Sequence, residues 1–174
     1  EPLKYINNVI VRFVPGGTLE EIVFYLNILK ILQSQGIKVI NTATSIENTV
    51  DKLYTSHLLN KNNIPTPMTY IFRGVDNAKN FLDSNIPSNG IVYKPLFGSQ
   101  GDNIRLIKKP SDITKLDNRS NIYYFQEYLE NTINHDYRGL IFNMKNSLKY
   151  FYMTRYGDTF INNYSKGGSC IKEN

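Results

Sequence analysis

The pattern of apolar and polar residues predicts a strand and then a capped helix at the start of the chain. Residues 8–14 alternate and are rich in β-branched side chains, which favours a strand. Pro15-Gly16-Gly17 predicts a turn, and Thr18 with Glu21 fits a capping box that begins a helix. Gly36 is placed to end this helix.

The helix predicted over residues 19–35 is apolar on most of its sides. It either packs between a sheet and other elements, or it forms a contact between subunits of a homo-oligomer. The apolar positions that leave both interpretations open are Ile22, Val23, Phe24, Leu26, Ile28, Leu29, Ile31 and Leu32.

Further along the chain, helices and strands alternate at first and strands dominate later, which indicates a mixed α/β to α+β layout. Pro65-Thr66-Pro67 forces an extended link and is the best candidate for a domain boundary. The other predicted elements are strands at residues 37–40, 68–72, 90–95, 103–107, 122–129, 137–142 and 148–155, and helices at residues 49–61, at residues 75–82 and from Pro110.

Composition excludes several classes of protein, including disordered, disulfide-rich and membrane-spanning ones. The chain has 174 residues, of which 41% are hydrophobic and 20% charged, so it can bury a core. Its one cysteine, Cys170, excludes a disulfide framework and fits a reducing compartment. The longest apolar run, residues 22–26, is too short to span a bilayer, and Glu1-Pro2 starts no signal peptide. We therefore expect a cytoplasmic protein without a membrane partner.

The formal net charge of +5 is compatible with a nucleic-acid partner, with an anionic nucleotide, or with no charged partner. The basic residues are spread along the chain, and only Lys108 and Lys109 are adjacent. A nucleic-acid binder would more often show a basic cluster interleaved with aromatic residues. We therefore expect no nucleic acid among the partners.

The segment over residues 91–101, IVYKPLFGSQG, carries the most chemistry. Gly98 and Gly101 let backbone amides approach an anion closely, and Lys94 adds a point charge at the end of an apolar strand, which suits nucleotide phosphates. The alternative is a β-hairpin with a glycine turn and a lysine that extends to solvent. The segment has neither a GxxxxGK[ST] nor a GxGxxG pattern.

Other features of the sequence are weaker evidence for a functional site when each is taken alone. Lys52 follows Asp51 at a helix start and by itself indicates a solvated first turn. Residues 123–130 form an aromatic strand that either offers backbone groups to a purine edge or is an ordinary core strand. Asp136 and Arg138 alternate on one strand and so share a face, while His57 and His135 are expected to be ordinary surface residues.

Taken in order, these segments resemble one family, the ATP-grasp ligases, and within it the branch that adds glutamate, typified by the ribosomal protein S6 modification enzyme and tetrahydromethanopterin α-L-glutamate ligase. The resemblance covers about residues 9–170, and it depends on several motifs in the right order rather than on any one of them. The matching residues are Asn41, Ile46-Glu47, Asp51-Lys52, Thr55, Leu58-Leu59, Ile64-Pro65-Thr66-Pro67-Met68-Thr69, Lys94-Pro95-Leu96-Phe97-Gly98-Ser99-Gln100-Gly101, Gln126-Glu127-Tyr128-Leu129, Asp136-Tyr137-Arg138, Arg155, Phe160, Asn163 and Gly167-Gly168.

The resemblance implies an α+β ATP-grasp fold with antiparallel sheets. Residues 1–50 would be a partial N-terminal α/β (pre-ATP-grasp) domain. Residues 51–125 would form the small ATP-grasp subdomain with its phosphate loop, and residues 126–174 the start of an incomplete C-terminal subdomain.

The resemblance also implies roles for individual residues. ATP would bind between Lys52 and Lys94, under a loop that contains Gly98, Ser99 and Gly101. Adenine would be read by a hinge that consists of Gln126, Glu127, Tyr128 and Leu129, and Asp136 would face the ribose. The side chains nearest the acyl phosphate and the acidic substrate would be Arg138, Arg155 and Asn163.

The implied reaction is the ATP-dependent joining of a carboxylate to an amine, through an acyl phosphate, to give an amide, ADP and phosphate. The amine would be glutamate or a similar amino acid, and the acidic acceptor is left open among a pterin glutamyl tail, a protein C-terminus and an amino-group carrier. Loop closure would keep water from the acyl phosphate.

Two departures from the family pattern bear on activity. Ile161 stands where the family usually has an ATP-contacting arginine, with Lys166 as a candidate replacement. The family's magnesium ligands are expected beyond residue 174, so no metal ligand is assigned to this chain. We therefore expect a fragment or a degenerate copy that binds nucleotide weakly and does not turn over alone. The alternative function is a non-catalytic nucleotide-binding module.

Overall fold

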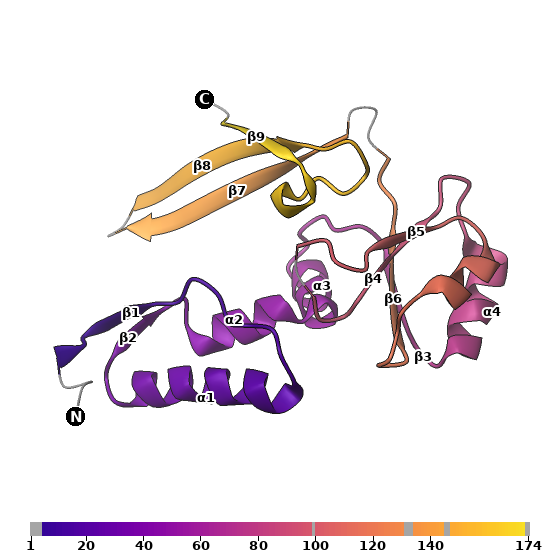
Figure 1. The fold of residues 1–174 in the computed structure, drawn as a ribbon. Coiled ribbons are helices and arrows are strands. Elements are labelled where there is room, and N and C mark those ends of the chain that lie inside the picture. Colours follow the sequence, from indigo (N-terminus) through magenta and orange to yellow (C-terminus); the bar gives the residue numbers. More distant parts are fainter. Residues whose placement is uncertain (1–4, 99, 131–133, 145–146, 173–174) are drawn as a thin grey trace. The chain divides into compact units, whose positions relative to one another are not determined.

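The computed structural model describes residues 5–98, 100–130, 134–144 and 147–172. These residues form two compact units that divide between Thr66 and Pro67, inside the proline-rich link (Figure 1). The finer division at residues 50 and 125 stays a prediction.

In the first unit, two short strands pair in parallel: β1 (Asn8–Ile10) and β2 (Lys38–Ile40). Helix α1 (Leu19–Ser34) lies between them in the sequence. The predicted capping box is present: the Thr18 hydroxyl accepts from the Glu21 amide at 3.3 Å, and the Glu21 carboxylate accepts from the Thr18 amide at 2.7 Å. Gly36 follows with a φ of +84°, which explains why glycine ends this helix.

Two sequence predictions for this unit were wrong in detail. The strand predicted to reach residue 14 stops at Ile10. The helix predicted over residues 49–61 begins only at Lys52, as α3 (Lys52–Lys61), and a separate helix before it, α2 (Ala43–Val50), was not predicted. The break lies at Asp51, whose carboxylate accepts hydrogen bonds from the amides of Leu53 and Tyr54 and so begins a new helix.

The core of the first unit is small. Leu29, Val39 and Ala43 are buried together, with Val9, Val11, Leu32 and Ile46 packed around them. Helix α1 buries only Leu26 and Leu29, and it exposes Phe24, Ile28 and Ile31. The helix therefore packs on its own unit through one narrow face, and its role in oligomer formation stays a prediction.

The second unit begins with a four-stranded antiparallel sheet in the order β3-β6-β4-β5. Its strands are β3 (Thr69–Arg73), β4 (Ile91–Lys94), β5 (Arg105–Ile107) and β6 (Ile122–Glu127). Helix α4 (Val75–Asn85) and the 3₁₀ turn η2 (Pro110–Lys115) contribute to one core with this sheet. That core consists of Ala78, Leu82, Ile91, Tyr93, Ile107, Ile113, Tyr123 and Phe125.

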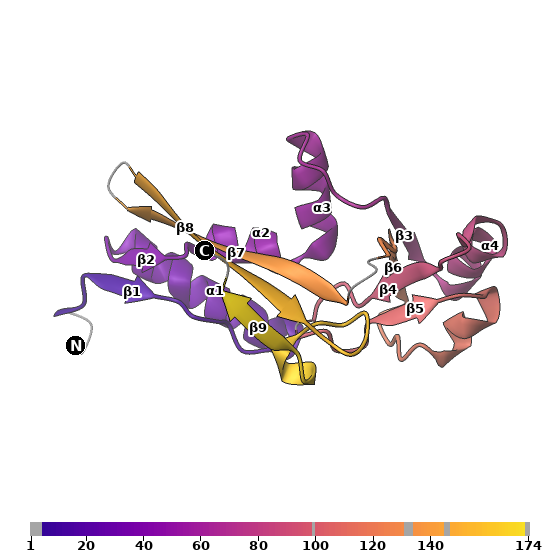
Figure 2. The same ribbon diagram turned by 90° about the horizontal axis from the view of Figure 1, so that it is seen from above.

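The unit continues into a three-stranded antiparallel sheet in the order β7-β8-β9 (Figure 2). Its strands are β7 (His135–Met144), β8 (Ser147–Tyr156) and β9 (Ser169–Lys172), with the 3₁₀ turn η3 (Tyr164–Lys166) before β9. The sequence predicted β7 and β8 and missed the short β9. The predicted α+β layout with antiparallel sheets is confirmed.

No helix within the described ranges combines the length and the apolar character that crossing a membrane requires.

Candidate functional site

The candidate site lies on the polar face of the four-stranded sheet. Successive side chains of a strand point to opposite faces. In β6, Tyr123 and Phe125 enter the core with α4, so Tyr124 and Gln126 lie on the other face. The strand register places Val92 of β4 and Thr69 of β3 beside Gln126 on that face.

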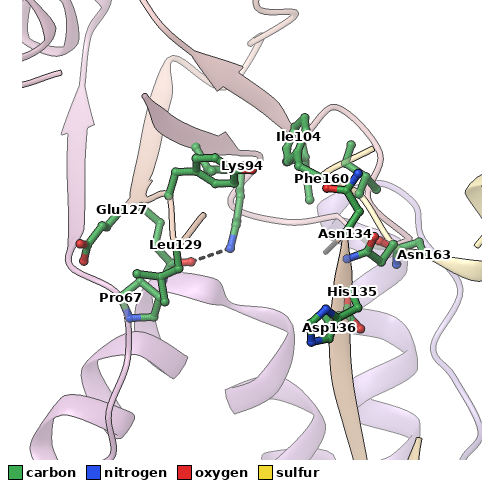
Figure 3. A pocket seen from close by; sticks show the side chains of 15 residues that line it. Pro67, Lys94, Ile104, Glu127, Leu129, Asn134, His135, Asp136, Phe160 and Asn163 are labelled. Carbon is green, nitrogen blue, oxygen red and sulfur yellow. Dashed lines mark hydrogen bonds between the residues drawn. The ribbon is translucent and has the colours of Figure 1, made fainter. Parts of the chain in front are cut away.

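A pocket of about 320 Å³ opens on this face (Figure 3). This volume is at the lower end of the range for small-molecule sites, so the pocket suits a small ligand or part of a nucleotide. It is lined by Pro67, Val92, Lys94, Ile104, Gln126, Glu127, Tyr128, Leu129, Asn134, His135, Asp136, Phe160, Ile161, Asn162 and Asn163.

Lys94 is the cation of the pocket wall formed by the sheet. Its Nζ donates a hydrogen bond to the Gln126 Oε1 at 2.5 Å (Figure 3). Burial lowers the pKa of Lys94 below the ordinary lysine value, because the charged form loses solvation. Among the described residues, no carboxylate forms an ion pair with Lys94. A phosphate placed here would supply the missing counter-charge.

Gln126 is held on its other side by two hydroxyl groups. Its Nε2 donates to Thr69 Oγ1 at 3.1 Å and to the Tyr124 hydroxyl at 3.3 Å. The Thr69 hydroxyl in turn donates to the carbonyl of Pro67 at 3.0 Å. Gln126 itself is 8% exposed, so this network fixes its carboxamide within the wall of the pocket.

The segment after β6 is anchored, yet it keeps backbone groups for a ligand. The Glu127 amide donates to the Met68 carbonyl at 2.8 Å, and Asn89 donates to the Tyr128 carbonyl at 3.0 Å. Between described residues, no backbone–backbone hydrogen bond involves Leu129. These residues line the pocket as the hinge hypothesis requires, and their reading of adenine stays a prediction.

Asp136 and Arg155 form one ion pair across β7 and β8. The Arg155 Nε and Nη2 donate to the two Asp136 carboxylate oxygens at 2.6 and 2.7 Å. These hydrogen bonds raise the pKa of Arg155 above its ordinary value. Asp136 lines the pocket and Arg155 does not. The sequence assigned them separate roles, whereas the structure joins them in one bidentate ion pair, which we call the fork.

The loop that contains Gly101 lies against residues 161–163. A Cβ at Gly101, whose φ is +78°, would come within 2.8 Å of both the Asn163 Oδ1 and the Ile161 Cγ2. Only glycine fits this close approach without a shift of the neighbours. Gly98 belongs to the same loop but does not line the pocket, and Ser99 lies outside the described residues.

Two further predicted site residues are not among those that line the pocket. Lys52 is the first residue of α3 and belongs to the first unit, so its distance from Lys94 is not defined. Arg138 is exposed on β7, two residues beyond Asp136 and on the same face, outside the residues that line the pocket. The roles of both stay predictions.

The sequence reasoning missed several pocket residues. His135, expected to be an ordinary surface residue, is half-buried, lines the pocket and lies 3.1 Å from the Tyr137 hydroxyl. Its position beside Asp136 is the signal that could have indicated this. Asn162 is buried with an Oδ1 that has no partner in the described part of the chain, and its neighbour Asn163 was already a candidate. An apolar wall residue such as Ile104 has no such signal.

No group of three His, Cys, Asp or Glu side chains is placed to hold a metal ion in the described residues. The position of the magnesium ligands therefore stays a prediction.

Residues 49–174 match the RimK-like ATP-grasp domain family. Because this match covers well over half of the chain, the chain belongs to that family. It is 29% identical over 183 residues to the tetrahydromethanopterin:alpha-L-glutamate ligase of Methanosarcina acetivorans, with 97% of the chain and 55% of the relative covered. The enzyme of the same name from Methanocaldococcus jannaschii is 30% identical over 157 residues, with coverages of 86% and 52%. The chain thus spans about half the length of the curated relatives it matches.

Solved structures confirm the ATP-grasp fold. The D-cycloserine synthetase DcsG superposes with a TM-score of 0.67 at 15% identity, over 98% of this chain and 61% of that one. A RimK domain ATP-grasp protein from Sphaerobacter thermophilus gives a TM-score of 0.60 at 16% identity, over 78% and 50%. The fold that the sequence implied is therefore present in this chain.

Proposed function

We propose that this chain is part of an ATP-dependent carboxylate–amine ligase that adds glutamate, or a similar amino acid, to an acidic acceptor through an acyl phosphate. The observation that carries the proposal is Lys94, a desolvated cation in a pocket wall with a neutral partner. The family match and the names of the glutamate ligases it resembles support the reaction class.

In this proposal, the pocket binds the nucleotide and Lys94 contacts a phosphate oxygen. An ammonium group in a poorly solvated wall interacts strongly with an anion, and its attraction grows as charge develops on the transferred phosphoryl group. Leu129 offers a backbone amide to the base, and Tyr128 packs edge-on against Phe160 beside it, with ring centroids 6.1 Å apart. Magnesium would offset phosphate charge, but the described residues offer no ligand set for it, so we assign it no residue here.

The remaining predicted residues keep their proposed roles. Arg138 is an exposed cation on the Asp136 face of β7, and it would bind the acceptor or glutamate carboxylate. Arg155 would act together with Asp136, with part of its charge already offset. Asn163 lines the pocket and would face the acyl phosphate. The loop with Gly98, Ser99 and Gly101 would cover the phosphates, and Lys52 would approach them from the first unit.

Two further expectations belong to this proposal. The cytoplasm is the expected compartment, and the free, exposed thiol of Cys170 is compatible with reducing conditions there. A homo-oligomer would use the exposed apolar side of α1, which includes Phe24, Ile28 and Ile31.

A non-catalytic nucleotide-binding module is the second candidate, and one observation favours it. Ile161 lines the pocket at the position where the family pattern has an arginine. An apolar side chain there cannot offset phosphate charge, so binding could persist while phosphoryl transfer is slow.

Phosphate release distinguishes the two candidates. The whole protein that carries this chain is incubated with ATP, magnesium, glutamate and each class of acidic acceptor, and phosphate and amide are measured. The ligase proposal expects release that requires both glutamate and an acceptor and that is lost in Lys94→Ala. Saturable ATP binding without amide formation across all acceptors would favour the binding module instead.

A further inference from the structure

Lys94 and Gln126 are brought together by sheet register rather than by sequence. They lie 32 positions apart on neighbouring antiparallel strands, and their side chains share the pocket face. Gln126 therefore stands between the ammonium group on one side and the hydroxyls of Thr69 and Tyr124 on the other. Both N–H donors of its carboxamide are engaged, so it has no spare donor with which to read a base.

The orientation of the Gln126 carboxamide follows from the chemistry of its partners. An ammonium group can only donate, so the carboxamide oxygen must face Lys94. The Thr69 hydroxyl gives its hydrogen to the Pro67 carbonyl and can therefore accept from the carboxamide nitrogen. These hydrogen bonds fit one orientation of the carboxamide, and its oxygen therefore gives the lysine amine a fixed acceptor.

The partner of Lys94 is neutral, and that decides how much positive charge the pocket offers. A glutamate at position 126 would supply the same oxygen and would also add a negative charge against the ammonium. The other titratable groups near Lys94 are Tyr124, which is opposite it in the register, and the pocket residues Glu127, Tyr128, His135 and Asp136. Asp136 is tied to Arg155, and Glu127 forms no ion pair with Lys94.

We propose that Gln126 is a positioning residue for Lys94: its carboxamide, fixed by Thr69 and Tyr124, holds the ammonium group in the pocket wall without neutralising it. The charge of Lys94 then stays free for an anionic ligand. That this ligand is a nucleotide phosphate rests on the proposed function, whereas the positioning itself does not.

The positioning is tested without any ligand, by NMR titration of the lysine Cε–Hε signals of the chain. Gln126→Glu should raise the pKa of Lys94 by about one unit because it adds a carboxylate, and Gln126→Leu should lower it further because it removes the acceptor. The signals of Lys108, which is exposed, serve as the internal control and should not move. Equal titration of Lys94 in all three proteins would overturn the proposal.

A second pair of variants covers the case in which the buried position tolerates neither change. Thr69→Val and Tyr124→Phe leave Gln126 in place but remove a partner of its Nε2. Each should shift the Lys94 titration in the same direction as Gln126→Leu, by a smaller amount. A change in thermal stability with no change in this titration would mean that the network is only structural.

The ligand test uses ATP and adenosine as probes, measured by calorimetry on the wild-type chain and on Gln126→Glu. We expect ATP affinity to fall at least tenfold in the variant and adenosine affinity to change less than twofold, since only ATP carries phosphate. Equal losses for both probes would overturn the charge argument. If the wild-type chain binds neither probe, the proposed function fails while the titration still decides the positioning.

Discussion

Two cations in the second unit, Lys94 and Arg155, show opposite ways of holding a positive charge. Lys94 faces the neutral carboxamide of Gln126, while Arg155 faces the carboxylate of Asp136 through two hydrogen bonds. Burial lowers the pKa of Lys94, and the hydrogen bonds that Arg155 donates to Asp136 raise the pKa of Arg155. Arg155 thus stabilises the pairing of β7 with β8, whereas no carboxylate in the described part of the chain forms an ion pair with Lys94.

The difference between the two cations indicates which of them can attract an anionic ligand more strongly. A cation already paired with a carboxylate gains little from a second anion, because its charge is largely offset. An uncompensated cation in a poorly solvated wall gains more. We therefore expect Lys94 to contribute more to anion binding, and Arg155 more to the pairing of β7 with β8.

The largest expected effect comes from breaking the paired cation. Asp136→Ala leaves the Arg155 guanidinium, whose side chain is 14% exposed, without its carboxylate. We expect the free energy of unfolding to fall by about 2 kcal/mol, measured by urea denaturation. The control is Asp117→Ala, because Asp117 forms only an exposed contact with Arg119 at 3.7 Å and should cost less than about 0.5 kcal/mol. Equal losses in the two variants would contradict the structural role of the fork.

The pH dependence of ATP binding tests the role that we propose for Lys94. Lys94 is charged below its lowered pKa and neutral above it, so ATP affinity should be highest below that pKa and fall as pH rises through it. The fall should reach about tenfold and begin below pH 10.5, the ordinary lysine value. Calorimetry over this window measures it, and a flat profile would show that Lys94 does not contact the ligand.

The titration of Lys94 also makes the stability of the folded chain depend on pH. The unfolded chain keeps the Lys94 proton up to an ordinary pKa, while the folded chain releases it earlier. Between the two values the unfolded state binds more protons, so this residue's contribution to stability rises with pH there. Lys94→Met should remove that rise, which urea denaturation at several pH values would detect.

A smaller effect is expected from adding a third cation. Ile161→Arg places a guanidinium in the wall of the pocket that Ile161 lines. We expect ATP affinity to increase by about fivefold, which corresponds to the net contribution of about 1 kcal/mol of a typical hydrogen bond. Ile104→Arg, on another wall of the same pocket, is the matched control for the effect of charge alone. Unchanged or weaker binding in Ile161→Arg would show that the family pattern does not transfer to this position.

Local signals explain what the sequence could predict. The capping box of Thr18 and Glu21 needs only neighbours within one turn, and it was confirmed. The alternation in β6 separates the core residues from the pocket residues in the same way. Helix α2 was missed because Thr, Ser, Asn and Val, which have low helix propensity, make up most of its eight residues, and because its start depends on the Thr42 cap.

The contacts that define the site were beyond the sequence because they are long-range. Lys94 meets Gln126 only once β4 and β6 are in register, and Asp136 meets Arg155 only across β7 and β8. The sequence placed all four residues near a nucleotide without indicating which would pair. Pairing decides whether a charge is free or offset, so the chemistry of this pocket could not be assigned before the fold was known.

The central claim is that the pocket binds nucleotide phosphate through Lys94, and the most direct measurement is ATP affinity by calorimetry in matched lysine variants. Lys94→Met removes the proposed contact, and Lys108→Met removes a charge from an exposed position. We predict at least a tenfold loss for the first variant and less than a twofold loss for the second, with both proteins folded. An equal loss in the two variants, or a larger loss in Lys108→Met, would contradict the claim.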